Sequence, residues 1–119
     1  MTALNIQRGD VWLVRFDPSE GDEIRKVRPA VVMTAVGAGR IALHIVVPVT
    51  GWQPQSSNYS FIVPLTPSAQ NGLTKDSAAN AFQVKSVAVS RFQTRLGMLN
   101  TDELVEIAAA IALCVGYQQ

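Results

Sequence analysis

The stretch "PAVVMTAVGAGRIALHIVVPVT", residues 29–50, decides the fold, because it holds two apolar runs joined by a glycine-rich turn. The runs at 29–35 and 41–50 are rich in β-branched residues, which predicts two strands. The turn at 36–40 is short enough to join them as an antiparallel hairpin. This hairpin brings the residues just before its first strand close to those that end its second.

Charged and polar side chains stand at the open end of this hairpin. Arg25, Lys26 and Arg28 precede the first strand, and Thr50 ends the second. A three-residue loop places Arg28 opposite Thr50, with their Cβ atoms about 5 Å apart on one face, whereas a two- or four-residue loop places it opposite Val49. A guanidinium beside a hydroxyl suits a phosphate. The alternative is a solvated arginine before a proline and a threonine that only ends a strand.

Other segments extend the sheet. The runs at 10–16, 59–65 and 77–89 read as further strands, the last as one or two short ones. Polar loops are expected at 17–28 and 51–58. The first of these is long for a compact domain, and loops of that length are often functional.

The C-terminal segment predicts a helix. Asn100 and Glu103 have the spacing of a capping box, and apolar residues then recur at helical spacing from Leu104 to Val115. Further apolar residues lie off that stripe, so the helix is apolar on more than one side. It is therefore either deeply buried or in contact with a second copy of the chain.

Composition restricts the class of protein. The chain has 119 residues, which fits a single domain over 1–119, and its 48% hydrophobic content is globular rather than disordered. The net charge of +1 means that nucleic-acid binding must come from local clusters of Lys and Arg. The single cysteine, Cys114, cannot form an internal disulfide. With no secretory or membrane-spanning stretch in view, we expect a cytoplasmic protein.

The residues give no support for a metal or cofactor. The sequence has no Cys/His cluster, and four acids crowd the loop from Asp17 to Glu23 without the spacing of a calcium loop. The single histidine, His44, lies on the same predicted strand as Thr50, roughly 20 Å away at about 3.3 Å per residue. That separation favours a structural histidine over a catalytic base.

Several motifs together resemble the MazF/PemK family of toxin endoribonucleases. "RGDVWLVRFDPSEGDEIRKVRPAVV" at 8–32 resembles the family's opening signature, and "VVPVT" at 46–50 its second motif. "YSFIVPL", "KDSA" and "QVKSV" resemble the later strands, and "LGMLNTDELVEI" resembles the run into the C-terminal helix. The resemblance covers residues 8–117, with the motifs in the family's order.

The resemblance implies an α+β, mainly β fold: an SH3-like barrelled antiparallel sheet with a C-terminal helix, the CcdB/Kid-like toxin fold. It implies a homodimer that acts as the toxin of a type II toxin–antitoxin system, with an antitoxin protein as partner. The implied activity is metal-independent, sequence-specific cleavage of single-stranded RNA, which inhibits translation and growth.

The resemblance also implies roles for individual residues. Arg28 and Thr50 occupy the positions of the family's catalytic Arg and Thr, and Glu23 that of its loop acid, which contacts RNA or orients Arg28. Cleavage of this kind begins with attack of the ribose 2′-hydroxyl on phosphorus and leaves 2′,3′-cyclic phosphate and 5′-hydroxyl ends. Arg28 and Thr50 would stabilise the charged transition state, and Glu23 is the local candidate for the base.

Residues around this group are candidates for holding RNA. They are Arg25, Lys26, Trp52, Gln83 and Lys85, and Arg91 and Arg95 could extend a phosphate track. Trp52 is either a stacking platform for a base or a buried loop anchor. Many relatives have an acid where this chain has Phe82 and an arginine in place of Lys85, and both differences bear on base preference. The alternative functions are a same-fold toxin that binds a protein such as DNA gyrase, and a catalytically silent binding module.

Overall fold

The computed structural model describes residues 5–36 and 41–117. Its strands are β1 (Asp10–Arg15), β2 (Val27–Val32), β3 (Leu43–Gly51), β4 (Ile62–Leu65), β5 (Ser77–Asn80), β6 (Lys85–Ala88) and β7 (Phe92–Met98). Three short 3₁₀ helices are η1 (Pro54–Asn58), η2 (Ala81–Gln83) and η3 (Val89–Arg91), and the α-helix is α1 (Thr101–Cys114). The expected class, a mainly β fold with one C-terminal helix, is confirmed.

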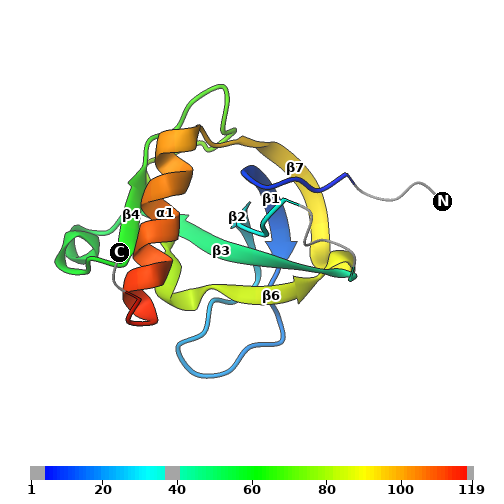
Figure 1. Ribbon diagram of the computed structural model, residues 1–119, viewed down its shortest axis with the longest axis horizontal. Helices are drawn as coiled ribbons and strands as arrows, with labels where there is room; N and C mark the ends of the chain where they lie inside the picture. The colour runs from blue at the N-terminus through cyan, green and yellow to red at the C-terminus, as the bar shows by residue number, and fades with distance from the viewer. Residues whose placement is uncertain (1–4, 37–40, 118–119) are drawn as a thin grey trace.

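The described strands form one antiparallel sheet that is strongly bent. The order is β4-β5-β3-β2-β1-β7, and β6 also pairs with β3. Figure 1 shows the sheet curling around, with α1 lying across one side near β4. Among the described residues β4 and β7 are not paired, so the sheet is open rather than a closed barrel.

The hairpin between β2 and β3 has the register that a three-residue loop predicts. Ala30 pairs with Pro48 and Val32 with Val46. Extended beyond Ala30, this register would place Arg28 opposite Thr50. The tip of the turn, 37–40, lies outside the described residues. The structure starts β2 at Val27, so Arg28 belongs to the strand and not to the preceding loop as the sequence suggested.

Both faces of β2 and β3 are buried, which explains their continuous apolar runs. Val31 and Val47 belong to one hydrophobic cluster, which extends to Ile107 of α1. Ala30 and Val46 belong to a second cluster on the other face, with Trp12, Val14, Phe16 and Phe92. The expectation that Trp12 and Phe16 are core residues is confirmed, since they are 5% and 0% exposed.

The strand β7 was not predicted from the sequence. Gln93, Thr94 and Arg95 are three successive polar residues, and all three are exposed, so the alternation typical of a strand is absent. Two register irregularities occur where β7 pairs with β1, between Val11 and Trp12 and between Leu13 and Val14. These irregularities disrupt the two-residue period that a sequence pattern would reveal.

The run at 77–89 contains two strands, β5 and β6, which follow each other along a single edge of β3 with a bend between them. Val49 pairs with Ala79 of β5, and Val46 pairs with Lys85 of β6. Three residue steps along β3, from Val46 to Val49, therefore correspond to six steps from Ala79 to Lys85, and the extra residues include η2. Within this bend, Phe82 is exposed, and the Gln83 side chain bonds to Ile24 N and Asp22 O.

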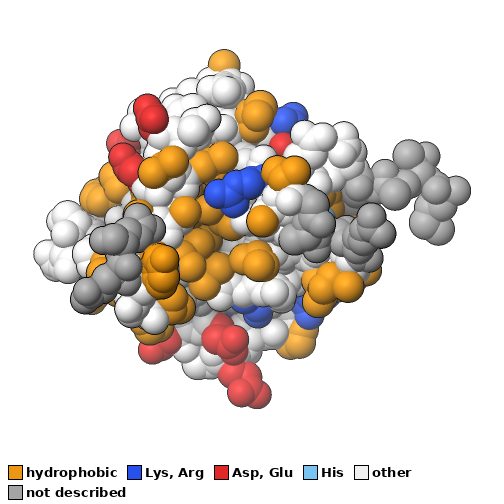
Figure 2. Space-filling model, viewed as in Figure 1, with side chains coloured by type: hydrophobic (Ala, Val, Ile, Leu, Met, Phe, Trp, Pro, Cys, Tyr) orange, Lys and Arg blue, Asp and Glu red, His pale blue; other side chains and the backbone are white. Residues whose placement is uncertain are grey.

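The helix begins where the capping pattern predicts. Asn100 Oδ1 accepts from Glu103 N at 2.8 Å, and Glu103 Oε1 accepts from Asn100 N at 3.0 Å. Only Ile107 and Ala110 are buried in α1, whereas Val105 is 61% and Leu113 55% exposed. Deep burial of the helix is therefore wrong, and an apolar surface remains over and beside it (Figure 2).

The loop between β4 and β5, residues 66–76, is held against β7 by two glycines and a buried amide. A Cβ on Gly72 would collide with the main chain of Leu96, and one on Gly97 would collide with that of Gln70. Asn71 is 2% exposed, and its side chain donates to Thr66 O and accepts from the amides of Ser68 and Leu73. This segment is thus fixed where it meets the end of β3.

None of the helices in the described part of the chain is long and apolar enough to span a membrane.

Candidate active site

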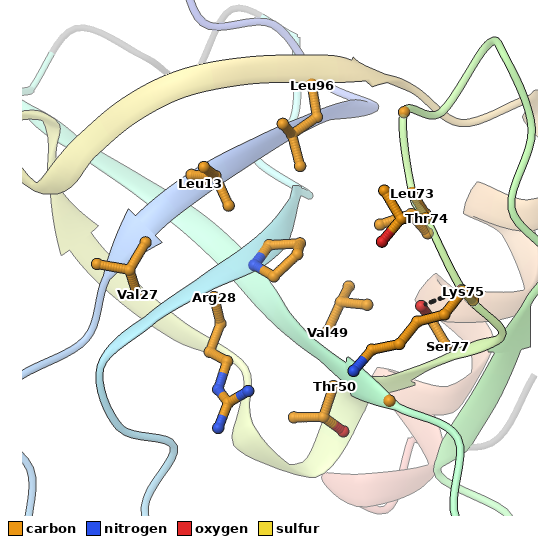
Figure 3. Close-up of a pocket in the computed structure, with 13 residues that line it drawn as sticks. Leu13, Val27, Arg28, Val49, Thr50, Leu73, Thr74, Lys75, Ser77 and Leu96 are labelled. Carbon is orange, nitrogen blue, oxygen red and sulfur yellow. Dashed lines mark hydrogen bonds between the residues drawn. The ribbon is translucent and has the colours of Figure 1, made fainter.

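Arg28 and Thr50 line one cavity of about 330 Å³ at the end of the β2–β3 hairpin. Figure 3 shows the Arg28 side chain reaching from β2 toward Thr50 of β3. The other lining residues come from β1, β2, β3, β5, β7 and the 66–76 loop: Leu13, Val27, Pro29, Val49, Gly51, Gly72, Leu73, Thr74, Lys75, Ser77 and Leu96. The sheet therefore brings together the two residues that the sequence analysis placed at a phosphate.

A proline explains why the cavity opens here. Met33 N donates to Ile45 O, so the odd-numbered residues of β2 direct their main-chain groups toward β3. Pro29 is in that set and has no N–H to offer Val49. Beyond Ala30 the β2–β3 ladder ends, while β2 stays paired with β1 through Arg28 and Val14, and β3 stays paired on its other edge with β5 through Thr50 and Ala78.

The Arg28 guanidinium contains an unsatisfied buried donor. Its Nε is buried without a hydrogen-bond partner, and it is the only such side-chain nitrogen or oxygen found in the described residues. An unmet buried donor costs about 1–3 kcal/mol. Native structures seldom retain one without a ligand or a functional reason. Arg28 lines the cavity, so an anion bound there is a candidate partner for this donor.

Glu23 lies at a second cavity, of about 450 Å³, and not beside Arg28. It shares that cavity with Gln83 and Lys85, two of the candidates for holding RNA, and with Asp22, Ile24, Phe82 and Val84. Its Oε1 accepts from Glu20 N at 2.8 Å. The described residues contain no ion pair between Glu23 and Arg28.

Gln83 fastens the loop between β1 and β2 to the sheet. Its Oε1 accepts from Ile24 N at 2.8 Å, and its Nε2 donates to Asp22 O at 2.9 Å. Both ends of the amide are thus engaged on either side of Glu23. In this structure Gln83 sets the position of the loop, a role that the sequence motif alone did not indicate.

The remaining RNA-binding candidates, Arg25, Lys26 and Trp52, line neither of the two cavities. Arg25 is exposed and donates to Gly21 O within its own loop. Lys26 is exposed and has a φ of 65°, at the point where the loop enters β2. Trp52 is half-buried, and its amide donates to Asp76 O, so the choice between stacking platform and anchor stays open.

Two arginines of the suggested phosphate track already have acceptors. Arg91 donates to the carbonyls of Arg15 and Asp17, and Arg95 Nε lies 3.3 Å from Asp10 Oδ1. Asp10 is 2% exposed and also accepts from Trp12 Nε1 at 3.1 Å. This ion pair and these hydrogen bonds give both arginines structural roles.

Phe82 is 63% exposed and completes a row of aromatic rings. The Tyr59 and Phe61 centroids are 5.2 Å apart, and so are those of Phe61 and Phe82. The row leads to the Glu23 cavity, which Phe82 lines.

His44 has a structural setting. Its Nδ1 is 2.9 Å from Thr34 Oγ1, and its ring packs edge-on against Phe92. Burial lowers the pKa of His44 below its ordinary value. Within the described ranges, no three or more His, Cys, Asp or Glu side chains are grouped so that they could hold a metal ion.

Lys75 lines the Arg28 cavity and was not singled out from the sequence. It is the first residue of the "KDSA" motif quoted for the resemblance, but neither spacing nor periodicity gave it a role. Only the folded position of the 66–76 loop brings it to the end of β3.

Comparison with known proteins extends over almost the whole chain. The family described as PemK-like, MazF-like toxin of type II toxin-antitoxin system matches residues 7–115. The chain is 32% identical to endoribonuclease MazF9 of Mycobacterium tuberculosis, over 91% of this chain and 94% of that protein. It is 36% identical to endoribonuclease toxin MazF of Escherichia coli K12, over 91% of this chain and 92% of that protein.

Solved structures share the fold. MazF from Deinococcus radiodurans superposes with a TM-score of 0.77 at 24% identity, covering 93% of this chain and 96% of that one. A mycobacterial endoribonuclease in complex with its cognate antitoxin superposes with a TM-score of 0.76 at 17% identity, covering 97% of this chain and 99% of that one.

Proposed function

Because the chain belongs to the PemK-like, MazF-like family of toxins, we infer that it is the toxin of a type II toxin–antitoxin system and an endoribonuclease. The matched relatives are named endoribonucleases and are covered almost from end to end. A gyrase-binding toxin of the same fold is not favoured.

We propose that Arg28 and Thr50 bind the scissile phosphate of single-stranded RNA. The observation that carries this proposal is the buried, unpartnered Nε of Arg28 in the cavity shared with Thr50. The attack of the 2′-hydroxyl on phosphorus concentrates negative charge on the non-bridging oxygens. Arg28 can donate to those oxygens through its guanidinium and Thr50 through its hydroxyl. The P–O5′ bond then breaks, and a 2′,3′-cyclic phosphate and a 5′-hydroxyl remain.

Glu23 is our proposed acceptor of the 2′-hydroxyl proton. A base must come within hydrogen-bond reach of the proton that it removes, and such contacts often form only in the bound complex. Glu23 lines the neighbouring cavity, so this role requires the 16–26 loop to move when RNA binds. Glu23→Gln should then lower kcat while RNA binding persists. Wild-type cleavage by this variant would remove Glu23 from the chemistry.

RNA bases and flanking phosphates are proposed to contact Lys85 at the Glu23 cavity, the exposed Arg25 and Lys26 of the loop before β2, and the half-buried Trp52 after β3. Gln83 acts through the loop that it holds. Binding should weaken as salt rises, because cationic contacts release counterions from the nucleic acid.

The partners proposed are a cognate antitoxin protein and a second copy of this chain. The exposed apolar side chains of α1, Val105 and Leu113, support the second copy. Sedimentation at micromolar concentration should give the mass of a dimer. A monomer there would contradict the proposal.

The function is tested by incubating the protein with a long single-stranded RNA in the presence of EDTA and mapping the new ends. We expect cleavage at a short recurring sequence, with 2′,3′-cyclic phosphate on one fragment and 5′-hydroxyl on the other. Uncut RNA from a folded, dimeric sample, or cleavage abolished by the chelator, would contradict it.

A further inference from the structure

We propose that Lys75 is a further catalytic residue, which binds the scissile phosphate together with Arg28 and donates to its non-bridging oxygens. This inference rests on the proposed function of the Arg28 cavity. Lys75 lines that cavity, and in the view of Figure 3 its side chain reaches toward Thr50 from the side opposite Arg28.

The backbone around Lys75 is fixed from two directions. Ser77 Oγ donates to Lys75 O at 2.8 Å, and Trp52 N donates to Asp76 O at 3.0 Å. The first bond ties Lys75 to β5, and the second ties its neighbour to the residue that follows β3. The Lys75 main chain therefore has a set position beside Thr50 and Gly51.

The absence of a side chain at Gly51 lets the ammonium group approach. A Cβ at Gly51 would lie 3.1 Å from Lys75 Nζ and 3.2 Å from its Cε. The end of Lys75 therefore lies over the β3 backbone, at the residue after Thr50. A larger residue at this position would push the ammonium group away from the strand.

The charge in the cavity is positive and uncompensated. Arg28 and Lys75 both line it, and none of its lining residues is acidic. The one ion pair found among the described residues joins Arg95 to Asp10, so Lys75 has no carboxylate partner there. Two cations that share a cavity repel each other until an anion binds between them.

A phosphodiester gains charge as it reacts, and this makes the second cation useful. The ground-state diester carries one negative charge, whereas the five-coordinate phosphorus formed by 2′-oxygen attack carries two. An ammonium group beside the guanidinium is therefore bound more strongly in the transition state than in the substrate. Its removal should lower kcat more than it raises KM.

The test compares Lys75→Met with Arg15→Met on an RNA containing the mapped cleavage sequence. Arg15 is the matched control, because it is an exposed cationic residue that lines neither the Arg28 cavity nor the Glu23 cavity. We expect Lys75→Met to lower kcat by about 10²–10³-fold, the loss typical for one transition-state donor. Arg15→Met should leave kcat within a few-fold of wild type, and Lys75→Arg should restore part of the loss.

A second variant moves the ammonium group without removing it. Gly51→Ala should lower kcat by less than Lys75→Met does. In the Lys75→Met background it should have little further effect, because both changes act on one contact. Thermal unfolding of each variant separates loss of chemistry from loss of fold.

The outcomes distinguish this proposal from the function on which it rests. If wild type cleaves in EDTA while folded Lys75→Met keeps the wild-type kcat, or changes KM alone, Lys75 is not a catalytic residue. Losses that add for Gly51→Ala and Lys75→Met would overturn the Gly51 contact. If wild type itself does not cleave, the proposed function fails first.

Discussion

Polar side chains at the two ends of β3 differ in whether they have hydrogen-bond partners. At one end, the hydroxyl of Thr34 meets His44 Nδ1 at 2.9 Å and accepts from Ile45 N at 2.9 Å, so the polar groups satisfy one another. At the other end, next to Thr50, Arg28 Nε is buried without a partner. The difference supports the proposal that Arg28 binds a ligand, because the polar groups around Thr34 and His44 have partners within the protein and the Arg28 donor has none.

The largest effect is expected from Arg28→Met. Loss of the guanidinium removes donors to the transition state and should lower kcat by at least about 10²–10³-fold. The same change removes a buried unsatisfied donor and keeps an extended side chain. We therefore expect the free energy of unfolding to stay equal or rise by about 1 kcal/mol.

Cleavage kinetics and denaturant unfolding of Arg28→Met measure the two effects separately. A variant that is inactive and also strongly destabilised would mean that Arg28 is a structural residue like those around His44. The polar groups at both ends of β3 would then be structural, and the difference between the two ends would not reflect a binding site.

The next effect is expected from Thr50→Val, which keeps the shape of the side chain and removes its hydroxyl. If the hydroxyl donates to the phosphate, kcat should fall by about 10²-fold. Thr50→Ser keeps the hydroxyl and should remain close to wild type. Equal activity of the valine and serine variants would restrict Thr50 to a strand-ending role.

A smaller effect is expected from Gln83→Leu. This change removes two hydrogen bonds to the 16–26 loop and leaves the main-chain groups of Asp22 and Ile24 without that partner. Each bond lost costs about 1 kcal/mol. KM for RNA should rise several-fold, and amide hydrogen exchange across the loop should accelerate.

Lys85→Met is the control for Gln83→Leu, because it alters the same cavity without releasing the loop. If exchange in the loop were unchanged in Gln83→Leu, Gln83 would not hold the loop in solution.

The smallest effect concerns His44. Burial lowers its pKa in the folded state, so the unfolded chain binds the proton more readily. The stabilisation from neutral His44 is therefore present above the ordinary histidine pKa, near 6.5, and is lost as the pH falls through and below it. His44→Gln should flatten the fall in unfolding free energy over this range, with cleavage at neutral pH unchanged. An identical acid dependence in both proteins would show that His44 does not contribute.

Local sequence patterns predicted most of the sheet and limited the central hairpin to two registers, of which the structure has one. The apolar runs, the glycine-rich turn and the capping box identified β2, β3 and the start of α1, because each reflects short-range constraints. The strand β7 escaped prediction because two register irregularities remove its two-residue period. The end of the hairpin also differed, because the β2–β3 ladder stops at Ala30 and Pro48 while β3 continues to pair with β5 on its other edge, which is a property of the whole sheet.

The candidate site was predictable in part for the same reason. Arg28 and Thr50 flank one hairpin, so of the loop lengths considered the three-residue loop placed them opposite each other, and the structure has the register of that loop. Lys75 reaches the cavity only because Gly72 and Gly97 let the 66–76 loop pack against β7. The loop-holding role of Gln83 depends on the bend at η2. Tertiary contacts of this kind leave no periodic signal in the sequence.

The most direct test of the central claim is a structure with the mapped RNA carrying a 2′-O-methyl group at the cleaved nucleotide, which blocks attack. We expect the oxygens of the scissile phosphate at hydrogen-bond distance, about 2.7–3.1 Å, from Arg28 Nε and Thr50 Oγ1. A scissile phosphate bound outside this cavity, with Arg28 Nε still unpartnered, would contradict the account.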